Sequence, residues 1–82
     1  MLIEGETLRK VREVYRMNRE EFGALMGVTG RFVSYVEAGD RKLPQYRADI
    51  LAHEIGLTPE KLTRLLAIYD ETAIRDATKA GI

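Results

Sequence analysis

The chain has 82 residues, of which 45% are hydrophobic and 32% are charged. This length allows a single small domain, because a chain of this size buries only about 60% of the surface that its unfolded form exposes. The sequence has no cysteine and one histidine, His53, so disulfides are excluded and we expect no metal or other cofactor. No apolar run approaches the roughly 20 residues of a membrane span, and no signal segment opens the chain. We therefore expect a cytoplasmic protein.

Thirteen basic and thirteen acidic residues give a net charge of zero, which by itself argues against a nucleic-acid partner. The charges are unevenly distributed, however. From Arg9 to Arg47, nine basic residues accompany five acidic ones, a surplus of four positive charges, whereas residues 48–82 have four basic and six acidic residues. The first half can therefore form a polyanion-binding face, although this charge distribution does not require one.

Apolar residues recur at spacings of three and four along the chain, and no stretch alternates with a period of two, which predicts an all-α fold. A first helix is predicted from Thr7 to Arg16. Asn18 is a suitable N-cap for a second helix, which would end at Gly27 with that glycine in the left-handed conformation. The two predicted helices are therefore separated by very few residues.

Thr29 can cap a third helix that ends at Gly39, and a fourth helix is predicted over about residues 45–55. Thr58 followed by Pro59 indicates the start of a fifth helix. This helix either continues to about residue 78 or breaks near residues 70–72. The whole chain is interpreted as one domain with its core in about residues 7–69, and residues 70–82 as a C-terminal extension that is a dimer contact or a tail.

The predicted helices each have an apolar face that would form the core. The residues of these faces, with Val28 of the turn, are Leu8, Val11, Val14, Tyr15, Phe22, Leu25, Met26, Val28, Val33, Val36, Ile50, Leu51, Ile55, Leu62, Leu65, Leu66 and Tyr69. Leu2 and Ile3 either pack on the edge of this core or form a short arm.

The turn between the second and third predicted helices is the most informative segment. Two helices joined by so short a turn cross steeply, at about 90–120°. Such a crossing requires a small residue where the second backbone passes over the first, and Gly23 is well placed to provide it. The small residue, turn glycine and capping threonine together indicate a helix-turn-helix.

A resemblance to a known family is carried by the segment Arg19-Glu20-Glu21-Phe22-Gly23-Ala24-Leu25-Met26-Gly27-Val28-Thr29, followed by Val33, Val36, Glu37 and Gly39. This pattern resembles the Cro/repressor-type helix-turn-helix of the XRE family, and the likeness covers about residues 8–66. The resemblance implies a compact five-helix lambda-repressor-like domain. Family members are mostly bacterial or phage-encoded transcriptional repressors that bind pseudo-palindromic double-stranded DNA as homodimers, with the third helix in the major groove.

The resemblance also implies roles for individual residues. The side of the third helix expected to read bases comprises Gly30, Arg31, Phe32, Ser34 and Tyr35. The residues expected to contact phosphates are Arg19, Thr29, Arg41, Lys42, Tyr46 and Arg47. Arg31 has the donors for a bidentate contact to guanine. Two positions depart from the family pattern, since Arg19 replaces a glutamine and Gly30 has no side chain.

The family further pairs an arginine of the first helix with the glutamate that ends the third, which implies a structural ion pair between Arg12 and Glu37. We place the expected dimer interface on the acidic half of the chain, at Leu65, Leu66, Ile68, Tyr69 and Ile74. The alternative function is an antitoxin-type or other protein-interaction module, whose C-terminal segment would bind a partner protein.

An enzyme is not expected. Ser34 is the only serine and His53 lies on a different predicted helix, so no nucleophile and base are brought together by the sequence pattern. The sequence also has no glycine-rich phosphate-binding loop.

Overall fold

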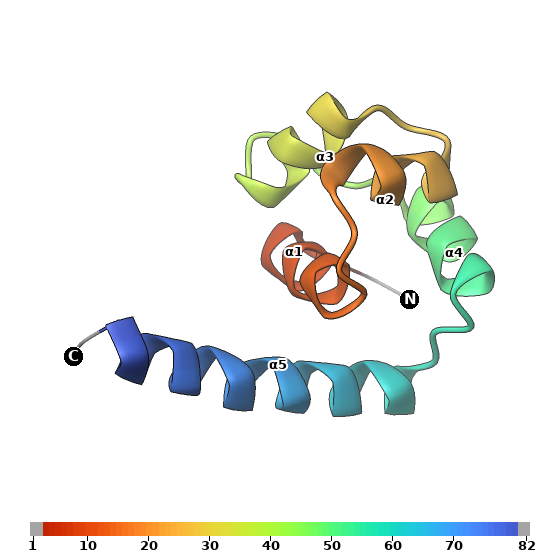
Figure 1. The fold of residues 1–82 in the computed structure, drawn as a ribbon. Helices are drawn as coiled ribbons and strands as arrows, with labels where there is room; N and C mark the ends of the chain where they lie inside the picture. Colours follow the sequence, from red (N-terminus) through yellow and green to blue (C-terminus); the bar gives the residue numbers. More distant parts are fainter. Residues whose placement is uncertain (1–2, 81–82) are drawn as a thin grey trace.

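The computed structural model describes the backbone of residues 3–80 and the side chains of residues 3–71 (Figure 1). Over this range the fold is all-α, as predicted, with no strand. The five helices are α1 (Gly5–Val14), α2 (Arg19–Met26), α3 (Gly30–Glu37), α4 (Gln45–Glu54) and α5 (Pro59–Ala80).

The helices are arranged around α1 and α2. Helix α1 packs against α3 and α5, and α2 packs against α3 and α4. In Figure 1, α5 runs as one long helix along the side of α1 that faces away from α2 and α3. The α2–α3 pair therefore lies at one edge of the molecule, and α5 lies at the opposite edge.

The helix starts follow the capping residues found in the sequence. Asn18 and Glu21 form a capping box, in which Asn18 Oδ1 accepts from the Glu21 N–H at 2.7 Å and Glu21 Oε1 accepts from the Asn18 N–H at 2.9 Å. Thr29 Oγ1 accepts from the Phe32 N–H at 3.1 Å at the start of α3. Thr58 Oγ1 accepts from the Lys61 N–H at 3.1 Å at the start of α5. These three starts are confirmed.

The end of α1 differs from the prediction. The helix spans residues 5–14 instead of 7–16, because Arg16 adopts the left-handed conformation with φ of 56°. The Met17 N–H then donates to the Arg12 carbonyl at 3.2 Å, which closes the last turn. Gly27 closes α2 in the same way with φ of 73°. An arginine is an unusual residue for this conformation, which is why the sequence did not indicate it.

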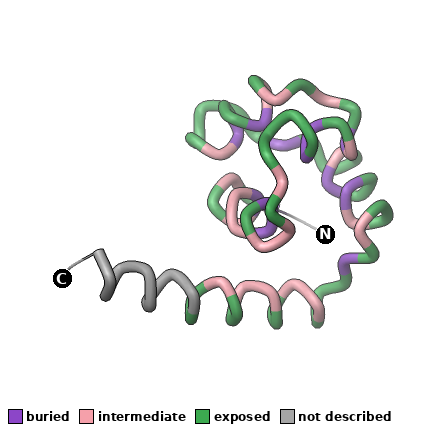
Figure 2. The backbone as a smooth tube through the Cα atoms, in the orientation of Figure 1, coloured by how far each residue is buried: buried purple, intermediate pink, exposed green. Residues whose placement is uncertain are grey.

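The core lies where α1, α2, α3 and α4 meet, and Figure 2 shows its buried residues on all four. Its largest fully buried side chains are Phe22, Leu8, Met26, Leu51, Val11, Val33 and Val36, all of which were predicted. Ile3 is also buried, so it packs on the core instead of forming an arm.

The burial pattern also differs from the predicted apolar faces. Ile50 is 38% exposed, because the face of α4 that meets the core contains Ala48 and Leu51 instead. The predicted apolar face of α5, formed by Leu62, Leu65, Leu66 and Tyr69, is half-buried and packs against α1. Leu43 and Leu57, which were not predicted, are buried in the segments that connect helices.

Helix α5 continues without interruption from Pro59 to Ala80, so the continuous helix, one of the two alternatives that the sequence left open, is confirmed, and the helix does not break near residues 70–72. None of the described helices is both long enough and apolar enough to cross a membrane.

Candidate nucleic-acid interface

The turn between α2 and α3 is built on close backbone packing at Gly23. A Cβ atom at this position would lie 2.6 Å from the Val28 carbonyl oxygen and 3.1 Å from that of Thr29. The expectation that Gly23 is the small residue of the crossing is therefore confirmed. Only three residues, the last of them the cap Thr29, separate the end of α2 from the start of α3, so the position of α3 is determined by α2.

One side of α3 is buried and the opposite side is free. Val33 and Val36 are fully buried in the core, whereas Arg31, Ser34 and Tyr35 are exposed. Arg31 makes no hydrogen bond or ion pair with any residue that the structure describes. Its guanidinium is thus available for a ligand at the free face of α3.

Two of the expected base-reading residues are placed differently. A Cβ atom on Gly30 would lie 3.0 Å from the Glu20 backbone nitrogen and 3.1 Å from its Cα. A side chain at position 30 would therefore point at α2, so the assignment of Gly30 to the outward face is corrected. Phe32 is half-buried and packs against the core, which leaves part of its ring exposed at the side of α3.

The loop after α3 places two cationic side chains beside its C-terminal end. The N–H groups of Asp40 and Arg41 both donate to the Tyr35 carbonyl, at 2.9 and 3.3 Å, so the loop is fixed to α3. Arg41 and Lys42 are exposed, and neither is paired with another described residue. Two free positive charges therefore lie near the exposed face of α3.

The start of α4 adds an exposed aromatic ring. Tyr46 is 58% exposed, and the guanidinium carbon of Arg47 lies 4.8 Å from its ring centroid. Nearby, the side-chain amide of Gln45 donates to Asp49 at 2.9 Å, and this hydrogen bond lowers the pKa of the Asp49 carboxyl. A negative charge thus accompanies the cations on this side of the molecule.

Arg47 has a structural contact that the sequence did not indicate. Its Nη1 donates to the Met26 carbonyl at 2.8 Å, which satisfies a free carbonyl at the C-terminal end of α2. Arg47 therefore ties α4 to the turn of the helix-turn-helix. A contact from Arg47 to phosphate stays a prediction, and Nη1 is already occupied.

The ion pair implied by the resemblance is present. Glu37 Oε2 accepts from Arg12 Nε at 2.6 Å and Glu37 Oε1 accepts from Arg12 Nη2 at 3.2 Å, with side chains that are 3% and 11% exposed respectively. Arg12 Nη1 also donates to the Met17 carbonyl at 3.0 Å. Arg19 was expected to contact phosphate, and its Nε donates to Glu37 Oε1 at 3.1 Å. The first three helices are thereby joined at one buried carboxylate.

The residues of the expected dimer interface do not form one free surface. Leu65 packs against the core, and the Tyr69 hydroxyl accepts from Arg9 Nη1 at 3.0 Å. This hydrogen bond raises the pKa of Arg9. Leu66 is half-buried and Ile68 is 55% exposed. Ile74 lies outside the residues whose side chains are described.

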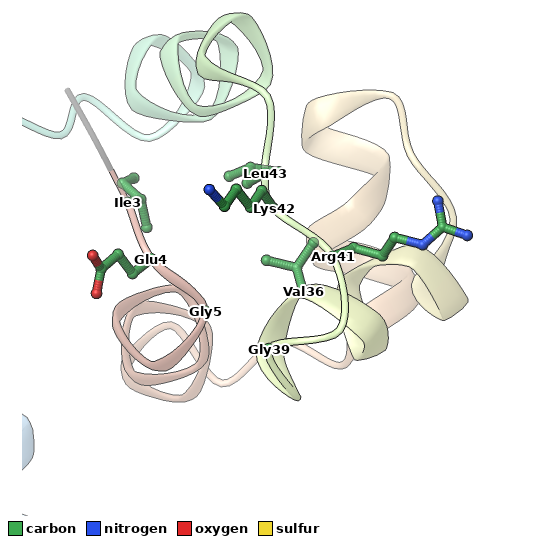
Figure 3. Close-up of a pocket in the computed structure, with 8 residues that line it drawn as sticks. All are labelled: Ile3, Glu4, Gly5, Val36, Gly39, Arg41, Lys42 and Leu43. Carbon is green, nitrogen blue, oxygen red and sulfur yellow. The ribbon is translucent and has the colours of Figure 1, made fainter.

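A pocket lies between the segment that precedes α1 and the loop that follows α3 (Figure 3). Its walls include Ile3, Val36 and Leu43. Figure 3 shows Lys42 extending along the pocket and Arg41 extending away from it. Among residues 3–71, no group of three or more histidine, cysteine or acidic side chains is placed to hold a metal ion.

These features define a candidate interface that consists of the exposed face of α3, the loop after it, and the starts of α2 and α4. The chain was compared with protein-family models, with curated proteins and with solved structures, and none of them matches it. The functional interpretation therefore depends on the residues of the chain itself and on how they are arranged.

Proposed function

We propose that this protein is a sequence-specific double-stranded DNA-binding regulator of transcription, acting as a homodimeric repressor of the XRE type. The observation that supports this most is the free face of α3. On this face Arg31 has no intramolecular partner among the described residues. The position of α3 is determined by its close packing on α2, and Arg41 and Lys42 lie beside the C-terminal end of α3.

The mechanism follows from the geometry of the DNA major groove, which is about 12 Å wide and admits one α-helix. Arg31 would donate to O6 and N7 of a guanine, and Ser34 and Tyr35 would contact neighbouring base edges. Lys42 and Arg41 would contact phosphates, which position the protein without reading sequence. The exposed part of Phe32 would pack on a thymine methyl group.

The test is selection of bound fragments from random or genomic duplex DNA, followed by sequencing. We expect a palindromic motif whose half-sites are about one helical turn, or about 34 Å, apart. Enrichment of no motif from either pool would contradict the proposal.

Replacement of Arg31 by alanine is expected to change which sequences bind, with a loss of about 1–3 kcal/mol of discrimination at one base pair. Lys42→Ala is the matched comparison. It removes one cation from the loop, so it should weaken binding to selected and random duplexes alike and reduce the salt dependence by about one phosphate contact. Both effects can be measured by fluorescence anisotropy. Equal losses on selected and random DNA for Arg31→Ala would contradict the base-reading role.

The homodimer is proposed to form through the side of α5 that contains Ile68, since Leu65 and Tyr69 are engaged with α1 within one chain. Ile68 is exposed to water in the single chain, and contact with a second protomer would bury its apolar side chain and favour the dimer. Ile68→Glu is expected to convert the dimer into a monomer without unfolding it, as measured by light scattering. Ala67→Glu, which adds the same charge at the adjacent exposed position, is the control and should remain a dimer. A wild-type monomer at micromolar concentration would contradict this part of the proposal.

A further inference from the structure

Glu37 is a buried carboxylate that is shared by two arginines. Its side chain is 3% exposed, and the two hydrogen bonds from Arg12 already neutralise its charge. Arg19 adds a third hydrogen bond and a second positive charge. The cluster of Arg12, Glu37 and Arg19 therefore carries one net positive charge, and that charge is at Arg19, which is the exposed member.

The guanidinium of Arg19 is held by one edge. Its Nε donates to Glu37 Oε1 at 3.1 Å, and its two terminal nitrogens have no partner among the described residues. The side chain is 49% exposed. Since a guanidinium has five N–H donors in a rigid plane, the four donors of the terminal nitrogens remain available, two of them side by side on the outer edge. The anchored side chain also loses less conformational freedom on binding a ligand than a free arginine loses.

Arg19 lies beside the start of α3. It is the first residue of α2, and a Cβ atom on Gly30 at the start of α3 would lie 3.0 Å from the backbone nitrogen of the next residue, Glu20. The capping box uses the Glu21 N–H, and the carboxylates of Glu20 and Glu21 lie in the same first turn, so an anion at this end of α2 would be held by the positive charge of Arg19. An anion bound there would lie next to the helix that is proposed to enter the groove.

We infer that Glu37 is a positioning residue for DNA binding: it holds Arg19 by Nε so that the outer guanidinium edge receives a backbone phosphate of the duplex. This inference rests on the proposed function, which names duplex DNA as the partner. It gives Glu37 a second role besides the ion pair with Arg12. It also gives a physical reason for an arginine at position 19, since a glutamine there would bring no charge to the phosphate.

The experiment compares the wild type with Arg19→Gln and Arg19→Lys in binding a labelled mixed-sequence duplex between about 50 and 200 mM salt. Arg19→Gln should reduce the slope of log affinity against log salt by about 0.9, the value for one phosphate contact. Arg19→Lys keeps the charge and the slope. It should still bind about fivefold more weakly, because one ammonium group cannot hold both the carboxylate and the phosphate in a fixed geometry.

Two matched controls separate this effect from charge in general. Arg64→Gln removes the same charge from an exposed arginine of α5 that has no partner among the described residues, and should leave the slope unchanged. Arg41→Lys makes the same replacement at a proposed phosphate contact that is not anchored among the described residues, and should weaken binding less than Arg19→Lys does, because no anchor is lost. Equal losses for Arg19→Lys and Arg41→Lys would overturn the positioning role.

The outcomes for this inference and for the proposed function are distinguishable. A wild type that binds the duplex with the same salt slope as Arg19→Gln would overturn the phosphate contact and leave the proposed function standing. A wild type that binds no duplex at any salt concentration would overturn both. The hydrogen bond that holds Arg19 to Glu37 can also be tested without DNA. By NMR, the Nε–H proton of Arg19 should exchange with water more slowly than that of Arg41, and equal exchange rates would contradict the positioning role of Glu37.

Discussion

Replacement of Glu37 by methionine is expected to lower the free energy of unfolding by about 4–5 kcal/mol. The Arg12 guanidinium would remain buried with the Met17 carbonyl as its acceptor, and breaking a buried ion pair by removing one partner costs about 3–5 kcal/mol. A domain of this size is stable by only about 4–12 kcal/mol in total. The variant should therefore be marginally folded, as measured by urea denaturation followed by circular dichroism.

Arg12→Met should cost less, about 3 kcal/mol, because Arg19 still donates to the Glu37 carboxylate. The double replacement should be less destabilised than the sum of the two single ones, since it leaves no unpaired charge in the core. Arg64→Met is the control, and it should change stability by less than about 0.5 kcal/mol because Arg64 is exposed. Additive effects of the two core replacements would contradict the direct coupling of Arg12 to Glu37.

Replacement of Gly23 by valine is expected to lower the free energy of unfolding by about 3 kcal/mol, at the upper end of the usual cost of overpacking. The added Cβ would lie 2.6 Å from the Val28 carbonyl oxygen. The neighbouring group is backbone, which cannot rotate away as a side chain does, so α2 and the turn must move apart. The same measurement by urea denaturation checks this expectation.

Ala24→Ser is the matched control for Gly23→Val. Ala24 is the next residue of α2 and is exposed, so a small replacement there should cost about 0.5 kcal/mol from helix propensity alone. A folded Gly23→Val variant should also bind DNA more weakly than the control, because α3 would be displaced relative to α2. Equal stability of the two variants would contradict the close packing at Gly23.

Local features of the fold were predictable from the sequence. Asn18, Thr29 and Thr58 identified the starts of three helices because a cap acts on backbone groups two or three residues away. Gly27 identified the end of α2, since glycine adopts the left-handed conformation without steric cost. Arg16 adopts the same conformation, but an arginine carries no such signal, and the end of α1 was placed two residues too late.

The candidate interface was predictable in part. Arg31, Ser34 and Tyr35 are exposed on α3, opposite the buried Val33 and Val36, because the helical period separates the two faces. Their contact with DNA stays a prediction. The structural contact of Arg47 could not be predicted, since its partner is the Met26 carbonyl, and every residue has a carbonyl.

The sequence by itself determined the all-α class, most helix boundaries and the buried faces of α2 and α3, because these depend on contacts between residues a few positions apart. The tertiary structure alone decided which side chains meet across helices. It exposed Ile50, buried Leu43 and Leu57, directed position 30 at α2, and brought Arg19 to the carboxylate that Arg12 already holds. Each of these depends on the distance between backbones that are far apart in sequence, and the spacing of residues along one helix carries no information about that distance.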